Sequence, residues 1–108
     1  KKKKNNMPSS VRWTLRPPAQ VALAEIWRHG ASSWGLDQAD RYADELFAVF
    51  DLLSDFSEIA RARAEFTPSV RIHLTGAHLV VYRLDGHTVE IIRLLHCAQN
   101  LTAFLLEP

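Results

Sequence analysis

The alternation of apolar and polar positions is clearest over residues 76–96. Two apolar runs flank Asp85-Gly86, and this dipeptide favours a β-hairpin because a type I′ turn needs positive φ at both central positions. A two-residue turn at this point predicts four cross-strand pairs: Leu84 with His87, Tyr82 with Val89, Val80 with Ile91, and His78 with Arg93.

The predicted register places apolar side chains on both faces of the hairpin, so each face needs a cover. It also divides the polar side chains. His78, Tyr82 and Arg93 would share one face, while Arg83 and His96 would lie on the other. The division depends on a regular hairpin, because a bulge moves the side chains of one strand to the opposite face.

Two helical patterns precede the hairpin. Apolar residues at spacings of three and four predict a helix over residues 19–33, with Trp27 on its core-facing stripe and Gly35 as its stop. The same spacing predicts a second helix over residues 38–54, with Asp37 as candidate N-cap. So short a connection forces the helices antiparallel, and their apolar side can cover the hairpin.

The other segments complete the fold. Residues 11–15 and 70–74 alternate with period two and predict strands. Residues 55–68 predict a loop with a helical turn between 59 and 65, and residues 101–106 form an apolar tail. The order β-α-α-β-β-β predicts an α+β fold, in which an antiparallel helical hairpin packs on a small, mainly antiparallel sheet.

A length of 108 residues suits one domain, expected over residues 11–108. Residues 1–10 are expected to be a leader, either disordered or added in cloning. All four lysines lie at positions 1–4, and without them nine arginines face 12 acidic residues, a net charge of −3. The pI is therefore no argument for nucleic-acid binding. No apolar stretch resembles a membrane span or a secretory signal, so a cytoplasmic protein is expected.

The polar residues of the predicted sheet are the candidates for chemistry. Arginine, histidine and tyrosine together suit phosphodiester cleavage, which needs an acid, a base and cations for the charged transition state. Ordinary alternation on a half-exposed sheet gives the same set, and its division between two faces favours a contact surface. The set is Arg71, His73, His78, Tyr82, Arg83, Arg93 and His96.

No cofactor or metal is expected. The histidines lack the i,i+4 spacing of zinc sites, and the single cysteine, Cys97, excludes a CxxC pair and an internal disulfide. The sequence also lacks a P-loop, a GxGxxG motif and a GxSxG motif.

Several short features follow one another along the chain: Pro18-Ala19, Glu25-Ile26-Trp27, Trp34-Gly35, Tyr42, Arg61 with Arg63, Gly76-x-His78, Tyr82-Arg83, Ile91-x-Arg93 and Leu95-His96. Their joint order and spacing resemble the ParE toxins of bacterial type II toxin–antitoxin modules, within the RelE/ParE superfamily. The resemblance covers about residues 13–100. Ala22, Ala60 and Gln99-Asn100 depart from the family, which commonly has an acidic residue, a glycine and Met-Asp there.

This resemblance implies a toxin that inhibits DNA gyrase and is neutralised in a hetero-oligomer with a ParD-like antitoxin. It implies action by binding, not catalysis, and no direct sequence-specific binding of nucleic acid. The residues expected to contact the target or the antitoxin are Arg61, Arg63, Arg71, His73, Arg83, Arg93 and His96.

Two alternatives stay open. A RelE-like, ribosome-dependent mRNA endonuclease would use His96, or His73 in its place, with Arg83 and Arg93. The rest of the chain after residues 1–4, here called the body, has no lysine and a net negative charge. This argues against the endonuclease, because RNA affinity rests largely on phosphate neutralisation. The other alternative is an inactive homologue that only binds antitoxin.

Overall fold

The computed structural model describes residues 12–97 of the chain. The observed order of elements confirms the predicted order β-α-α-β-β-β and the α+β class. The predictions for residues 1–10 and 101–106 lie outside the described residues. The elements are β1 (Trp13–Leu15), α1 (Pro17–Trp34), α2 (Leu36–Asp55), the short 3-10 helix η2 (Ser57–Ile59), β2 (Arg71–Thr75), β3 (His78–Asp85) and β4 (Thr88–His96).

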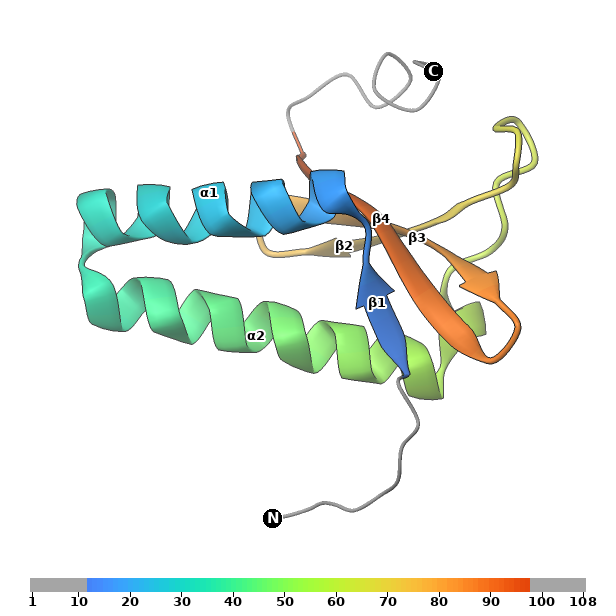
Figure 1. The fold of residues 1–108 in the computed structure, drawn as a ribbon, viewed down its shortest axis with the longest axis horizontal. Helices are drawn as coiled ribbons and strands as arrows, with labels where there is room; N and C mark the ends of the chain where they lie inside the picture. The colour runs from blue at the N-terminus through green and yellow to red at the C-terminus, as the bar shows by residue number, and fades with distance from the viewer. Residues whose placement is uncertain (1–11, 98–108) are drawn as a thin grey trace.

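The two long helices form an antiparallel hairpin whose turn is a single residue, Gly35 (Figure 1). Its φ of 99° lies in the region that favours glycine. The Gly35 N–H donates to the Ala31 carbonyl, and the Gly35 carbonyl accepts from the Ala39 N–H, each at 3.1 Å. Helix α2 therefore begins before Asp37, and the prediction of Asp37 as N-cap is wrong.

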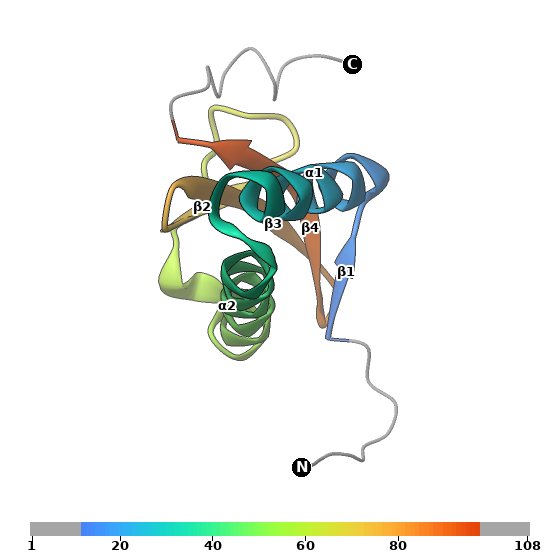
Figure 2. The same cartoon turned by 90° about the vertical axis from the view of Figure 1, so that its left-hand side faces the viewer.

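The four strands form one mixed sheet in the order β1-β4-β3-β2. Strand β1 is parallel to β4, and the other two pairs are antiparallel. The helical hairpin covers one face, here called the helix face (Figure 2). Its core contains Ala19, Leu46, Phe50, Leu53, Val80, Tyr82, Val89, Ile91 and Leu94.

The opposite face of the sheet, here called the loop face, has a smaller core. Phe66 and Val70, which come from the segment between η2 and β2, pack there against Val81 and Leu95. Ile72, Leu79 and Ile92 border this cluster. The prediction that both faces of the hairpin need a cover is thus confirmed, and the second cover is the 60–70 segment.

The predicted register of the β3–β4 hairpin is wrong. Asp85 pairs with Thr88, so the turn consists of Gly86 and His87, one residue later than predicted. Gly86 has a φ of 65°, which a residue with a Cβ adopts only under strain. Because the turn moves by one residue, Tyr82 pairs with Ile91 instead of Val89.

A β-bulge regroups the polar side chains of the hairpin. Tyr82 pairs with Ile91 but Val81 pairs with Arg93, so β4 carries one extra residue at Ile92. Beyond the bulge His78 pairs with His96, not with Arg93. Cross-strand partners lie on the same face.

The predicted division between faces is therefore wrong at two residues. His96 joins His78 and Tyr82 on the helix face, and Arg93 joins Arg83 on the loop face. The bulge exchanges the faces of these residues because one extra residue reverses the alternation along β4.

Two local predictions also need correction. The helical turn expected between residues 59 and 65 lies instead at Ser57–Ile59, where the Ser57 carbonyl accepts a 2.7 Å hydrogen bond from the Tyr82 hydroxyl. Trp27 is 36% exposed and not in the core. Its indole N–H donates to Asp40 Oδ1 at 2.8 Å, so it links α1 to α2 at the surface.

Candidate partner-binding surface

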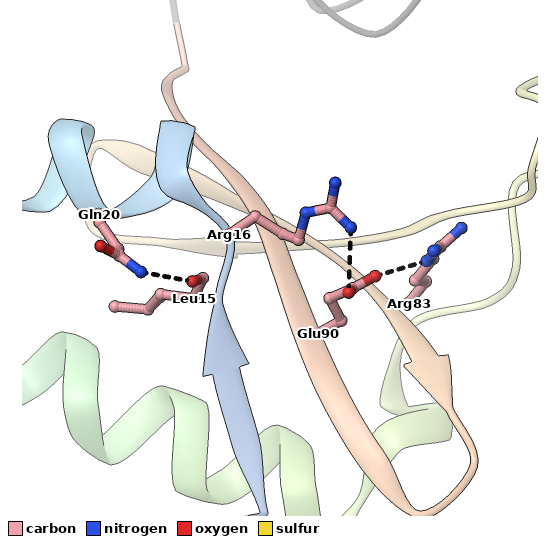
Figure 3. Close-up of polar contacts among 5 residues, drawn as sticks. All are labelled: Leu15, Arg16, Gln20, Arg83 and Glu90. Carbon is pink, nitrogen blue, oxygen red and sulfur yellow. Dashed lines mark hydrogen bonds and ion pairs between the residues drawn. The ribbon is translucent and has the colours of Figure 1, made fainter.

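Glu90 is the centre of a polar network on the loop face (Figure 3). Arg83 Nε donates to Glu90 Oε1 at 2.7 Å, and Arg16 Nη1 donates to Oε2 at 3.3 Å. The Glu90 side chain is only 14% exposed. The hydrogen bond from Arg83, together with that from Arg16, holds the pKa of the Glu90 carboxyl below its ordinary value.

The fold positions all three members of this network. Arg83 and Glu90 are register partners of β3 and β4, so they share a face. Arg16 follows β1 directly, and its N–H donates to the Ile91 carbonyl at 2.9 Å. Gln20 Nε2 fixes the same junction by donating to the Leu15 carbonyl at 2.9 Å (Figure 3).

Two hollows flank Arg83. The larger, of about 350 Å³, lies where β2 begins and is lined by Ala62, Pro68, Ser69, Arg71, Arg83, Leu84 and Asp85. The smaller, of about 170 Å³, lies over the Glu90 network and is lined by Arg16, Phe66, Thr67, Pro68, Val70, Arg83, Glu90 and Ile92. Arg83 and Pro68 line both hollows, so the two hollows are adjacent to each other.

The arginines of the 60–71 segment have separate roles. Arg63 Nε donates to Glu65 Oε2 at 2.8 Å, and its guanidinium lies 5.9 Å from the centre of the Phe66 ring. This hydrogen bond lowers the pKa of Glu65. Arg71 Nη1 donates to the Ala60 carbonyl, and Arg61 is exposed. Of these three arginines, Arg71 lines the larger hollow, and Arg61 and Arg63 do not.

Arg16, Arg71 and Arg83, here called the arginine surface, border the two hollows, and no histidine lines either hollow. His73 pairs with Val80 and lies two residues after Arg71, which pairs with Tyr82, so both side chains are on the helix face of the edge strand. His96 pairs with His78, five residues from Arg83 along β3, a separation of about 17 Å for an extended strand. The structure does not bring the proposed catalytic set of His96, Arg83 and Arg93 together, because His96 is on the other face and near the other end of β3.

His78 and His96 form a separate cluster with Tyr42. The Tyr42 hydroxyl lies 2.6 Å from His78 Nδ1, and the His96 ring packs edge-on against the His78 ring at 5.5 Å between centroids. Burial, and then the neighbouring His96, lower the pKa of His78. Burial raises the pKa of Tyr42.

Arg16 and Glu90 were not among the residues singled out from the sequence. A correct register would have revealed Glu90, because it stands opposite Arg83. Arg16 gave a weaker signal, since its place before Pro17-Pro18 predicts only the end of a strand. Its proximity to Glu90, 74 positions later, follows from the pairing of β1 with β4.

Two features are absent from residues 12–97, a metal-binding cluster and a membrane-spanning helix. In this part of the chain no group of three or more His, Cys, Asp or Glu side chains is arranged to hold a metal ion. None of the helices it contains is long and apolar enough to cross a membrane.

These features define a small α+β protein with two hollows that arginines line. The family described as "ParE toxin of type II toxin-antitoxin system, parDE" matches residues 13–101. The chain is 39% identical to Toxin ParE1 of Mycobacterium tuberculosis over 88 residues, which cover 81% of this chain and 90% of that protein. It is 34% identical to Toxin ParE1 of Caulobacter vibrioides over 93 residues, 86% of this chain and 96% of that protein.

The chain therefore belongs to the ParE toxin family of type II toxin–antitoxin systems. Its fold is also similar to a solved structure described as the chromosomal ParDE TA system from P. aeruginosa. The TM-score is 0.66 at 17% sequence identity, over 80% of this chain and 95% of that one. The resemblance seen in the sequence is thus confirmed at the level of family and fold.

Proposed function

We propose that this ParE-family toxin inhibits DNA gyrase in the cytoplasm by binding it, without turnover of its own, and that a ParD-like antitoxin neutralises it in a hetero-oligomer. The bound gyrase would leave cleaved DNA unrejoined. The family match supports the toxin role. The solved structure of similar fold, a ParDE system from P. aeruginosa, supports an antitoxin as partner.

One observation carries the choice of binding over catalysis. Arg16, Arg71 and Arg83 border the two hollows, whereas no histidine lines either of them. General acid–base catalysis needs its proton donor or acceptor within hydrogen-bond reach of the reacting group. The hollows have arginines but no histidine in their lining, which suits recognition of an anionic partner better than RNA cleavage.

Supercoiling by purified gyrase tests this proposal. Adding the free chain in excess is expected to suppress supercoiling and to accumulate cleaved DNA. Prior mixing with the ParD-like antitoxin encoded beside the toxin is expected to restore normal activity. Unimpaired supercoiling at excess chain would exclude gyrase as the target.

A His96→Ala variant separates binding from catalysis. It is expected to inhibit gyrase as the original chain does, because His96 is remote from the arginine surface. In a translating extract, neither protein is expected to cut mRNA. Site-specific cuts that disappear in His96→Ala would instead support the endonuclease alternative.

A further inference from the structure

We propose that the larger hollow beside Arg83 receives an Asp or Glu side chain of an extended antitoxin segment, held between the guanidinium groups of Arg71 and Arg83. This inference rests on the proposed antitoxin partnership. It adds the chemistry by which the segment is recognised and the position where it binds.

The backbone beside the hollow is open to an extended chain. Strand β2 starts at Arg71, which pairs with Tyr82, but β3 continues to Asp85. Beyond Tyr82, β3 thus has no strand partner on the β2 side among residues 12–97. An exposed strand edge pairs readily with an added strand. A peptide that continues the line of β2 would pass directly over the larger hollow.

The side chains of the hollow favour a carboxylate. Arg71 forms no ion pair within residues 12–97, where its hydrogen bond is to the Ala60 carbonyl. Arg83 uses only Nε for Glu90, and its guanidinium end extends beyond that carboxylate (Figure 3). Planar guanidinium groups bind carboxylates through paired N–H donors. Asp85 is the only acidic residue in the lining.

Glu90 acts here as a positioning residue. Its single negative charge is shared by Arg16 and Arg83, so the three groups together retain one positive charge. The hydrogen bond to Glu90 fixes the side chain of Arg83, which lines both hollows. An incoming carboxylate then meets an arginine that is already ordered, which reduces the entropy lost on binding.

The smaller hollow adds an apolar requirement. Phe66, Val70 and Ile92 line it beside Pro68, which borders both hollows. An apolar side chain of the same segment would bury surface there, next to the bound carboxylate. The expected recognition element is therefore an acidic residue with an apolar neighbour, in an extended stretch of the antitoxin.

A protein carboxylate suits this surface better than the phosphates of a nucleic acid. Affinity for RNA or DNA grows with the number of phosphates neutralised. The lysine-free body has an excess of acidic residues, and Arg71 and Arg83 are the two cations of the larger hollow. Such a site holds one anionic group, not a backbone of them.

The test compares antitoxin binding by three single-charge variants of the full chain in titration calorimetry. Arg71→Gln and Arg83→Gln are each expected to weaken binding about tenfold or more, as for loss of a charge-assisted hydrogen bond. Arg61→Gln is the matched control, because it removes an exposed arginine of the same segment that borders neither hollow. It is expected to change affinity less than about threefold, as for an exposed charge.

The outcomes are distinguishable. Binding by the original chain that is unchanged in Arg71→Gln and Arg83→Gln would overturn the hollow but not the antitoxin partnership. No binding by the original chain would overturn both. Arg71→Gln leaves the Arg83–Glu90 pair in place, so its result stands even if Arg83→Gln lowers stability.

Two further measurements identify the ligand chemistry. Changing each antitoxin Asp and Glu to its amide is expected to reveal one position whose effect vanishes in Arg71→Gln. A labelled single-stranded RNA is expected to bind the free chain weakly and equally in all variants. RNA binding that is lost in Arg71→Gln and Arg83→Gln, with antitoxin binding intact, would assign the hollow to phosphate and overturn the proposal.

Discussion

The Tyr42 hydroxyl lies 2.6 Å from His78 Nδ1, and this contact fastens helix α2 to the first residue of strand β3. The pair is half-buried and is completed by the edge-on ring of His96. It belongs to the helix face and is separate from the arginine surface. Its consequences are therefore expected in stability and not in partner binding.

The first prediction concerns the pH dependence of stability. Since the pKa of His78 is lower in the folded chain than its usual 6.5, the unfolded chain binds more protons in the interval below 6.5. The contribution of His78 to the free energy of unfolding is therefore complete above pH 6.5, and it is lost as the pH falls through the folded pKa. Urea unfolding between pH 5 and 8 is expected to show this loss in the original chain.

The His78→Gln variant is expected to lack that loss below pH 6.5, because glutamine does not titrate. His87→Gln, in the exposed hairpin turn, is the control and is expected to keep it. An equally steep fall in His78→Gln would assign the dependence to another group.

The second prediction concerns Gly76, whose φ is 57°. A Cβ at this position would lie 2.8 Å from the Tyr42 hydroxyl oxygen, closer than real contacts allow. Gly76→Ala is expected to lower the free energy of unfolding by about 2–4 kcal/mol, from backbone strain and overpacking together. Denaturant titration measures this loss.

Gly86→Ala is the matched control for this substitution. Gly86 also has positive φ, at 65°, but a Cβ there would meet no atom within 4 Å. Its expected cost is the backbone strain alone, about 1–2 kcal/mol. Equal losses in the two variants would show that the contact with Tyr42 relaxes without cost.

The third prediction concerns Glu90. Because Arg83 and Arg16 hold its folded pKa below 4.5, its contribution to stability is complete above that pH and is lost as the pH falls further. Glu90→Gln is expected to flatten the pH dependence of unfolding between about pH 5 and 3. Glu25→Gln, on an exposed position of α1, is expected to leave the dependence unchanged.

The fourth prediction contrasts two tryptophans. Trp13 donates its indole N–H to Asp51 at 2.9 Å, and its ring lies 5.9 Å from Phe47 and 5.0 Å from Phe50. Trp13→Ala is expected to cost about 3 kcal/mol of unfolding free energy, as for loss of a packed aromatic ring. Trp34 is 74% exposed at the tip of the helical hairpin, and Trp34→Ala is expected to stay within about 0.5 kcal/mol. Comparable losses would contradict the packing described for Trp13.

The helices and strands were largely predictable from the sequence because their signals are local. Apolar spacing identified both helices, although each extends by one to two residues at its ends. The Gly35 stop was correct because positive φ is a property of a single residue. Asp37 was wrongly assigned as the cap because it has the usual capping side chain, while Gly35 ends one helix and begins the next through its backbone.

The candidate site was less predictable. The sequence pointed to Arg71 and Arg83, which do border one hollow. It also grouped them with His73 and His96, neither of which lines a hollow, and His96 lies opposite His78 at the other end of β3 from Arg83. Arg16 and Glu90 entered the site through the pairing of strands far apart in the chain.

By itself the sequence determined the order of elements, the α+β class and the family resemblance, since these follow from periodicity and from the spacing of residues. Only the tertiary structure decided which polar side chains meet. One extra residue at Ile92 exchanges the faces of Arg93 and His96. The physical reason is the two-residue period of a strand: a single insertion hardly changes the apolar pattern, but it reverses the direction of every side chain beyond it.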